Sequence, residues 1–340
     1  MDLDVMRETA RDLVTPRKGI LAADESTGTI KKRFDQIGVD STEENRRRYR
    51  QMLFTTLGLG AHISGVILYD ETIRQATDDG TPFVEVLEKA GVIAGIKVDT
   101  GAKPLAMFPD ETVTEGLDGL RERLAEYREI GARFAKWRAT ITISEGMPTD
   151  FAIFANAHAM ARYAALCQEA DIVPIVEPEV LMDGDHHIDL CESATARTLQ
   201  ALYAQLAEHR VHLPATLLKV NMVLCGKRCS DQAGHEQIAE ATVRCLASTV
   251  PADVPGVVFL SGGMSDEDAT IRLNEMNKQS GHPWELSFSY GRALQQPSLK
   301  VWGGDTSNVE AAQRVLQHRA RMNGLARSGE YSANLELSAP

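Results

Sequence analysis

The chain has 340 residues, of which 43% are hydrophobic and 25% are charged, so it has enough apolar residues for a large core. Its formal net charge of -12 argues against a nucleic-acid partner. We expect no membrane association, because no apolar run approaches the length of a membrane span. A cytoplasmic location is expected as well, because the acidic start Met1-Asp2-Leu3-Asp4 does not resemble a secretory leader.

The five cysteines are odd in number and are typical of reduced intracellular thiols. Cys225 and Cys229 have the spacing of half a zinc site, but no second pair of ligands has a matching spacing. We therefore predict no metal.

Short apolar strands alternate with longer amphipathic segments from about residue 19 to about residue 324. Ser41-Thr42-Glu43-Glu44 is a capping-box pattern that predicts the start of a helix. The predicted elements, in chain order, are strand 19–24, a helix from residue 41, strand 62–70, a weak helix 83–90, strand 94–99, helix 117–130, strand 134–138, helix 149–169, strand 172–179, helix 194–209, strand 217–222, helix 235–248, strand 257–261, helix 266–278, strand 286–290 and helix 309–323.

Eight strand-then-helix units predict an α/β protein with a parallel sheet, and eight is the number that closes into a (β/α)8 TIM barrel. We expect one catalytic domain over residues 1–324, with Gly324 as the stop of the last helix. Residues 325–340 are expected to form a short flexible tail. The alternative is an open doubly wound sheet, which is disfavoured because no Gly-x-Gly-x-x-Gly follows the first strand.

Lys219 lies inside the apolar run Leu217-Leu218-Lys219-Val220, which is short, has no helical period and follows Pro214. A charged ammonium in a buried strand costs several kcal/mol unless it is paired or loses its proton. A lysine that loses its proton near neutral pH is a nucleophile for carbonyl carbons. The alternative is a structural lysine whose ammonium reaches water from the strand end.

Polar side chains cluster at the carboxyl ends of the other predicted strands too. Residues two apart share a face of a strand, so Lys219 is expected to share one with Leu217 and Asn221. In a barrel all these strand ends meet at the catalytic rim. The sets that share a face or end a strand are Asp24 with Ser26, Lys97 with Asp99, Lys136 with Arg138, Glu177 with Glu179, Ser261, and Ser289 with Gly291 and Arg292.

A neutral lysine amine can attack a ketone to form a carbinolamine and then a protonated Schiff base, which accepts the electrons of a breaking carbon–carbon bond. Lys136 is a nearby cation that would favour the neutral amine of Lys219. Glu177, Glu179 and Asp24 can serve as the acid and base for dehydration and cleavage. The glutamates can equally be ion-pair partners of the two lysines, and both interpretations can hold together.

Two groups of residues suggest a substrate with two phosphates. Ser261-Gly262-Gly263 and Gly291-Arg292 follow the seventh and eighth strands, where barrels commonly bind phosphate. Ser-Gly-Gly on its own is more often a simple turn. The second group comes from the opening loop and the third and fourth strands, although Lys32 and Arg33 could instead lie on a solvated helix face: Lys32, Arg33, Lys97 and Arg138.

With these residues in place, the sequence resembles the class I, Schiff-base fructose-1,6-bisphosphate aldolases over about residues 15–325. The matching segments occur in the family's order, and together they are specific. They are GILAADESTG from Gly19, GIKVD from Gly95, FAKWR from Phe134, VEPE from Val176, LLK from Leu217 with the following Asn221-Met222, FLSGG from Phe259 and FSYGRAL from Phe288.

The resemblance implies a lyase of glycolysis and gluconeogenesis, an aldehyde-lyase, that cleaves fructose 1,6-bisphosphate reversibly to dihydroxyacetone phosphate and glyceraldehyde 3-phosphate. It implies no cofactor or metal, and a homotetramer. Lys219 matches the Schiff-base lysine, and Glu177 the acid and base of carbinolamine chemistry. Asp24 matches the carboxylate that acts on the C4 hydroxyl, Lys136 the second active-site lysine, and Glu179 the group that holds the lysines in place.

The same resemblance implies two phosphate regions. The C1 phosphate is expected at Ser261, Gly262, Gly291 and Arg292, and the C6 phosphate at Ser26, Lys32, Arg33, Lys97 and Arg138. Gly263 and Ser289 are also expected to bind the substrate.

Two departures from the family pattern leave points open. Val220 replaces the proline that commonly follows the lysine, with little expected effect, since it should face away from the site. The chain ends without the terminal tyrosine of tailed members, and Tyr331 matches only an upstream tail position. The missing terminal tyrosine bears on which group protonates the enamine and on the preference between fructose 1,6-bisphosphate and fructose 1-phosphate.

Three alternatives to the bisphosphate aldolase were considered. A Schiff-base aldolase for a singly phosphorylated ketose is disfavoured by the two groups of cations. A catalytically dead barrel serving as a scaffold would be expected to lack a matched lysine or glutamate, and none is missing. A metal-dependent aldolase is disfavoured because the adjacent His186 and His187 would point to opposite faces of a strand.

Overall fold

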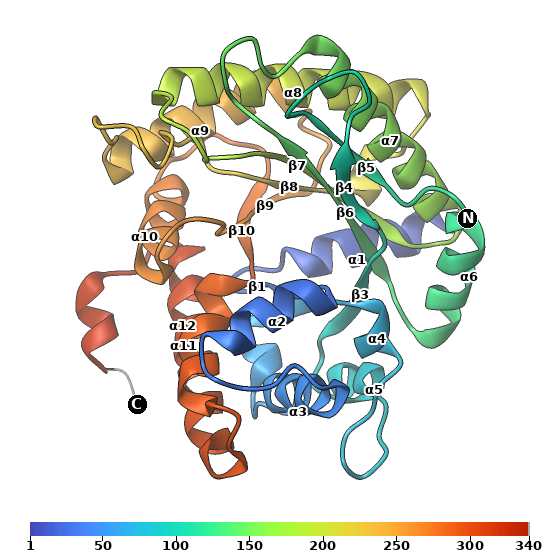
Figure 1. Ribbon diagram of the computed structural model, residues 1–340, viewed down its shortest axis with the longest axis vertical. Coiled ribbons are helices and arrows are strands. Elements are labelled where there is room, and N and C mark those ends of the chain that lie inside the picture. Colours follow the sequence, from blue (N-terminus) through green and yellow to red (C-terminus); the bar gives the residue numbers. More distant parts are fainter. Residues whose placement is uncertain (339–340) are drawn as a thin grey trace.

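The computed structural model describes residues 1–338, and its eight predicted strands form one closed parallel barrel (Figure 1). The ring closes where β1 pairs with β10, with Ile20 opposite Ser289. The (β/α)8 prediction is thus confirmed, and the open-sheet alternative is wrong. In order around the barrel, the strands are β1 (Gly19–Ala23), β2 (Ile63–Leu68), β3 (Ile93–Lys97), β6 (Phe134–Ile141), β7 (Val173–Val180), β8 (Leu217–Val220), β9 (Gly256–Phe259) and β10 (Glu285–Tyr290).

Helices surround the barrel, and an antiparallel hairpin of β4 (Gly101–Pro104) and β5 (Thr112–Glu115) follows β3. The helices are α1 (Leu3–Leu13), α2 (Thr27–Asp35), α3 (Glu43–Phe54), α4 (Asp70–Ile73), α5 (Phe83–Lys89), α6 (Leu120–Ile130), α7 (Asp150–Glu169), α8 (Ile188–Glu208), α9 (His235–Thr249), α10 (Asp266–Asn277), α11 (Arg292–Trp302) and α12 (Val309–Ala326), with short 3₁₀ turns Leu59–Ala61, Leu213–Ala215, Thr306–Asn308 and Ala333–Ser338. Over the described range, no helix is both long and apolar enough to cross a membrane.

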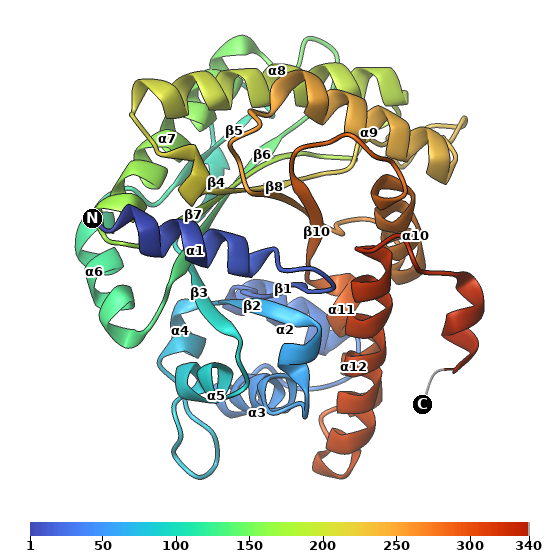
Figure 2. The same ribbon diagram turned by 180° about the vertical axis from the view of Figure 1, so that it is seen from behind.

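The barrel interior is packed, so it is not a pore. Phe134, Ile20, Ile175 and Leu217 fill it from the strands, and Gly95 makes room because a Cβ there would lie 2.3 Å from the Phe134 ring. Helix α1 crosses the amino-terminal end of the barrel and buries its apolar side against the same cluster (Figure 2). Since that end is closed, a substrate can enter the barrel only at the carboxyl ends of the strands.

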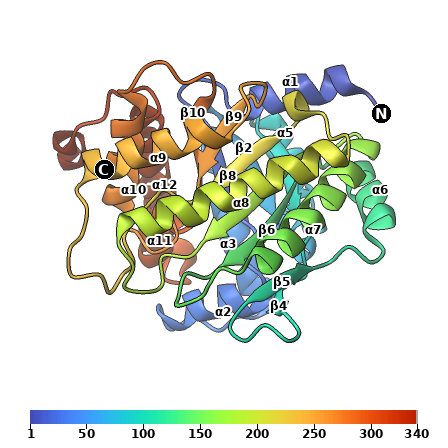
Figure 3. The same cartoon turned by 90° about the horizontal axis from the view of Figure 1, so that it is seen from above.

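Figure 3 shows the two ends of the barrel, with α1 at one end and α2 and the β4–β5 hairpin at the other. The hairpin and α2 lie at the open rim. The sequence analysis did not predict the hairpin, α1, α2, α4 or α11, and it placed the start of α8 six residues too late, at residue 194. Thr42, rather than Ser41, caps α3, because its side chain accepts the N–H of Asn45.

The predicted helix stop at Gly324 is wrong, because α12 continues to Ala326. Gly324 is needed for packing: a Cβ there would lie 2.6 Å from the carbonyl oxygen of Arg17. The segment beyond α12 has defined contacts, since Glu336 accepts from Tyr331 Oη at 3.0 Å and also pairs with His318 and Arg319 of α12. Residues 339–340 of the predicted tail lie outside the described residues.

Candidate active site

Four charged side chains meet at the open rim of the barrel, each from the end of a different strand. Asp24 follows β1, Lys136 lies on β6, Glu177 on β7 and Lys219 on β8. The Glu177 carboxylate lies between the two lysines, 3.2 Å from Nζ of Lys219 and 3.2 Å from Nζ of Lys136. Asp24 Oδ2 lies 2.8 Å from the same Lys136 nitrogen. Two ammonium positions therefore alternate with two carboxylates.

The cluster is shielded from water, with Lys136, Glu177 and Lys219 at most 5% exposed and Asp24 13% exposed. Burial alone would raise the pKa of the Asp24 and Glu177 carboxyls, but Lys136 and Lys219 outweigh it and hold both pKa values below the usual range. Burial opposes the charge of Lys136 as well, yet Asp24 and Glu177 raise its pKa above the usual value. At neutral pH both carboxyls are ionised and Lys136 is a cation.

A second ion-paired layer lies beside this cluster on the side of β3. Lys97 Nζ lies 2.9 Å from Asp99, whose other oxygen accepts the backbone N–H of Arg138. The Arg138 guanidinium pairs with Glu179. In the structure, Glu177 bridges the two lysines, while Glu179 contacts an arginine, so the expected contact of Glu179 with the lysine pair is not present.

The prediction that Asn221 shares a face with Lys219 is wrong. Strand β8 ends at Val220, one residue before Asn221, so the alternation of faces stops there. Asn221 Oδ1 accepts the backbone N–H of Val180 at 2.9 Å, and its Nδ2 donates to Thr195 of α8. Asn221 therefore supports β7 and α8 from behind, and does not line the site.

Backbone and hydroxyl donors face the cluster from β9 and β10. Ser261, Gly262, Ser289 and Gly291 line the same cavity as Lys219. Helix α11 begins at Arg292 without a side-chain cap from Gly291. The N–H of Ala293 donates to the Ser261 hydroxyl at 3.4 Å, and the N–H of Leu294 donates to the Gly291 carbonyl. The start of this helix, with its N–H of Arg292, therefore faces the cavity beside Ser261 and can bind an anion. The Ser289 hydroxyl is buried and has no partner among the described residues. Gly263 does not line the cavity and instead packs under Met182 and Lys227.

Lys32 and Arg33 lie on helix α2 rather than in a loop, and they face different sides of the cavity. Lys32 is exposed at the rim and lines it with Ser26, whose hydroxyl lies 3.1 Å from that of Thr29. Arg33 pairs with the buried Glu25, and its Nη2 lies 3.6 Å from the position of a Cβ on Gly291. Arg33 thus belongs with the Gly291–Arg292 side, which differs from its predicted place beside Lys97 and Arg138.

Sequence reasoning missed Glu25, which lies next to Asp24. Its carboxylate is 3% exposed and pairs with Arg33 and Arg50, while Gln295 Nε2 donates to it at 2.9 Å. Burial alone would raise the pKa of the Glu25 carboxyl, but the cations Arg33 and Arg50 hold this pKa below the usual value. The polar run Asp24-Glu25-Ser26 at a strand end was the available signal.

The cavity at the rim has a volume of about 410 Å³ and is lined by every predicted site residue except Gly263. Within residues 1–338, no cluster of three histidine, cysteine or carboxylate side chains is arranged to hold a metal.

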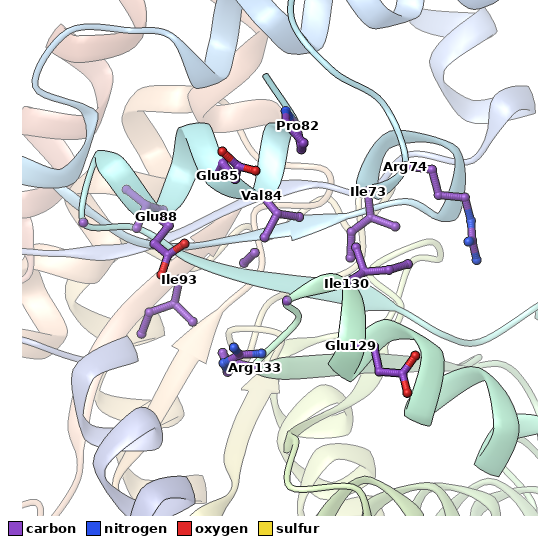
Figure 4. A pocket seen from close by; sticks show the side chains of 14 residues that line it. Ile73, Arg74, Pro82, Val84, Glu85, Glu88, Ile93, Glu129, Ile130 and Arg133 are labelled. Atoms are coloured by element: carbon purple, nitrogen blue, oxygen red, sulfur yellow. The ribbon is translucent and has the colours of Figure 1, made fainter. Parts of the chain in front are cut away.

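A larger hollow of about 780 Å³ lies between α5 and α6, near the starts of β3 and β6. Figure 4 shows Glu85, Glu88 and Glu129 around it, with Arg133 below. Its glutamates would repel a phosphorylated substrate, so size alone does not locate the active site.

A closed (β/α)8 barrel with two buried lysines interleaved with carboxylates, and with anion donors on its rim, defines a barrel enzyme of the lysine-dependent type. The family model for class-I fructose-bisphosphate aldolase matches residues 5–339. The chain therefore belongs to the class I fructose-bisphosphate aldolase family.

Individual relatives agree with this family. The chain is 57% identical to a probable fructose-bisphosphate aldolase class 1 of Xanthomonas campestris, covering 97% of this chain and 99% of that one. It is 55% identical to fructose-bisphosphate aldolase 1 of Toxoplasma gondii, over 96% and 90% of the two chains. A Plasmodium falciparum aldolase, solved with TRAP and a small-molecule inhibitor, is similar with a TM-score of 0.96 at 48% identity, over 97% and 96% of the chains.

Proposed function

We propose that the chain cleaves fructose 1,6-bisphosphate reversibly to dihydroxyacetone phosphate and glyceraldehyde 3-phosphate through a Schiff base on Lys219, as an enzyme of glycolysis and gluconeogenesis. The observation that carries the proposal is the Glu177 carboxylate at 3.2 Å from both lysine nitrogens. This carboxylate is ionised and can accept the proton that Lys219 must lose before it attacks a ketone.

The first half of the reaction forms the Schiff base. The Lys219 amine adds to the C2 carbonyl of the substrate to give a carbinolamine. Glu177, now protonated, gives its proton to the departing C2 hydroxyl, which leaves as water, and a protonated Schiff base remains. Lys136 keeps its positive charge next to Glu177 throughout, because Asp24 and Glu177 raise its pKa.

The second half breaks the bond. Asp24, which is ionised because the lysines lower its pKa, takes the proton of the C4 hydroxyl. The C3–C4 bond cleaves, glyceraldehyde 3-phosphate leaves, and the bond electrons move into the iminium to give an enamine. Protonation at C3 and hydrolysis then release dihydroxyacetone phosphate and restore the amine.

Two regions of the cavity are proposed to hold the phosphates. For the C1 phosphate, support comes from Ser261, the start of α11 at Gly291 and Arg292, and the guanidinium of Arg33. For the C6 phosphate, support comes from the rim residues Ser26, Lys32, Lys97 and Arg138. Since Glu179 pairs with Arg138, we assign it to holding that cation in place.

The adduct on Lys219 provides the test. Borohydride in the presence of dihydroxyacetone phosphate should reduce the Schiff base to a stable secondary amine, and peptide mapping should place it on Lys219. Activity should survive EDTA. Loss of activity in EDTA without any adduct would contradict the proposal, and the Lys219→Met variant serves as the control for non-specific reduction.

We also propose a cytoplasmic homotetramer, with a catalytic domain that extends past residue 324 to include the whole of α12 and the buried Arg327. A relative from Arabidopsis thaliana at 53% identity is named as a cytosolic fructose-bisphosphate aldolase, and all five cysteines are free. Light scattering should give about four times the chain mass of 37.2 kDa.

A further inference from the structure

A second group of cations surrounds a hollow of about 460 Å³ on the amino-terminal side of the barrel, away from the proposed active site. His62, the residue before β2, forms one wall, and α12 forms the facing wall. The lining residues are Gly58, Ala61, His62, Arg314, Gln317, His318 and Arg321. In a chain with a net charge of -12, such a cluster of basic residues is unexpected.

The residues of α12 that line the hollow share one face of the helix. Arg314, Gln317, His318 and Arg321 are spaced at i, i+3, i+4 and i+7, which places them along a single stripe. The two arginines at the ends of the stripe are separated by about 10 Å of helix axis, from a rise of 1.5 Å per residue. A ligand with two phosphoryl groups can offer one anionic group to each arginine.

The positive charge of the hollow is poorly compensated. Within the described part of the chain, Arg321 forms no ion pair, and Arg314 is paired only at 3.9 Å with Glu310, whose carboxylate is 90% exposed. Nδ1 of His62 is buried without a partner. Burial, followed by Arg321 and Lys18, lowers the pKa of this histidine, as expected where cations face one another without counter-charges.

Besides Glu310, two other carboxylates lie near the edges of the hollow. Glu336 accepts from His318 at 2.8 Å, and Glu330 binds Arg17, the third cation that acts on His62. Neither carboxylate lines the hollow. An anion placed between Arg314 and Arg321 would therefore find guanidinium donors that compete with one carboxylate only, the exposed Glu310 at 3.9 Å from Arg314, among the described residues.

We propose that this hollow is a second anion site, which binds a small molecule bearing two phosphoryl groups, with Arg314 and Arg321 each holding one of them. Gln317 and His318 lie between the two arginines, while His62 forms the opposite wall. Nucleoside diphosphates and bisphosphorylated sugars share this chemistry, and inorganic pyrophosphate is its simplest probe.

The histidines give a readout specific to this hollow. His62 and His318 line it, whereas the described residues that line the rim cavity include no histidine. With histidine rings labelled by ¹³C, a pyrophosphate titration followed by NMR should shift the resonances of both histidines and saturate. Orthophosphate should bind at least tenfold more weakly, because it can engage only one arginine.

Two substitutions then test the assignment. In the Arg321→Gln protein, the pyrophosphate concentration that half-saturates the histidine shifts should rise at least tenfold. The control Arg244→Gln should leave this concentration unchanged, since Arg244 is an exposed arginine of α9 that does not line the hollow. Unshifted histidines in the parent protein, or equal shifts in the Arg321→Gln protein, would overturn the proposal. A nucleoside diphosphate and a non-cleavable hexitol bisphosphate, titrated in the same way, identify the source of the two phosphoryl groups.

The result does not depend on the proposed aldolase mechanism. Arg292→Gln, which alters the rim cavity, should keep the histidine shifts. Conversely, Arg321→Gln should keep the Lys219 adduct. Histidine shifts that vanish in Arg292→Gln would place the anion at the rim and refute a second site.

Discussion

Replacing Glu177 by Gln removes the group that the mechanism requires and keeps its shape. In the parent protein, the carboxylate lies 3.2 Å from Lys136 and 3.2 Å from Lys219. The amide cannot take the proton that Lys219 loses, nor return one to the C2 hydroxyl. Loss of a positioned acid and base typically costs 10² to 10⁴ in rate, so we expect kcat to fall about 10³-fold, or about 4 kcal/mol of transition-state stabilisation.

The KM for fructose 1,6-bisphosphate should change less than about threefold, because Glu177 is not among the proposed phosphate donors, and uniform binding is unaffected. Cleavage is followed by coupling the triose phosphates to NADH oxidation, alongside the yield of the borohydride adduct, which should fall in parallel with kcat. The fold should persist, because Lys136 keeps Asp24 at 2.8 Å.

Glu179→Gln is the matched control, two residues along the same strand. Since Glu179 pairs with Arg138, we expect mainly a higher KM, from a less well held phosphate ligand, and kcat within about tenfold of the parent. If Glu177→Gln retained more than a tenth of the parent kcat, or if both variants lost kcat equally, Glu177 would not be the acid and base.

Three further predictions follow from the described contacts. The folded pKa of Asp24 lies below its ordinary value of 3.8. The stabilisation by this carboxylate is therefore complete above pH 3.8 and disappears as the pH falls through the lower folded pKa. Asp24→Asn should make Tm fall less steeply with acid, and an unchanged decline of Tm would refute the ion pair with Lys136. Gly95→Ala should lower stability by about 1–3 kcal/mol through overpacking against Phe134, as measured by urea unfolding, while Gly28→Ala, whose Cβ would contact nothing within 4 Å, should not. A truncation after Tyr331 removes Glu336 and its ion pairs with His318 and Arg319, so it should lower Tm slightly and keep turnover within a few fold. A truncation after residue 324 also removes the buried Arg327 and its 2.7 Å contact with Glu285, so it should lower Tm further; equal Tm values for the two truncations would show that Arg327 is dispensable.

Much of the site was predictable because strand alternation is a local property. A buried strand places every second side chain on one face, and the carboxyl ends of parallel strands converge. Lys136, Glu177 and Lys219 could therefore be assigned to one rim from their positions in apolar runs. The eight repeated units also predicted the barrel, since sheet closure buries both edge strands.

The partners of each charge could not be predicted in this way, because they depend on register and on where each strand ends. Strand β8 stops one residue before Asn221, which turns that amide toward α8. Glu179 meets Arg138 because β6 and β7 pair with Thr140 opposite Glu179, which brings Arg138 alongside. Gly324 has the sequence signature of a helix end, yet it lies within α12. The residue at this position is a glycine because the Arg17 carbonyl packs against it.

The sequence by itself thus determined the barrel, its open rim and the residue types on that rim, because these follow from apolar period and chain order. Only the tertiary structure decided which carboxylate separates the two lysines, and on which side of the cavity Arg33 lies. It also decided that two arginines of α12 face His62 across a hollow. The physical reason is that ion pairing and burial act between residues far apart in the chain, whose distances are set only when the ring of strands closes.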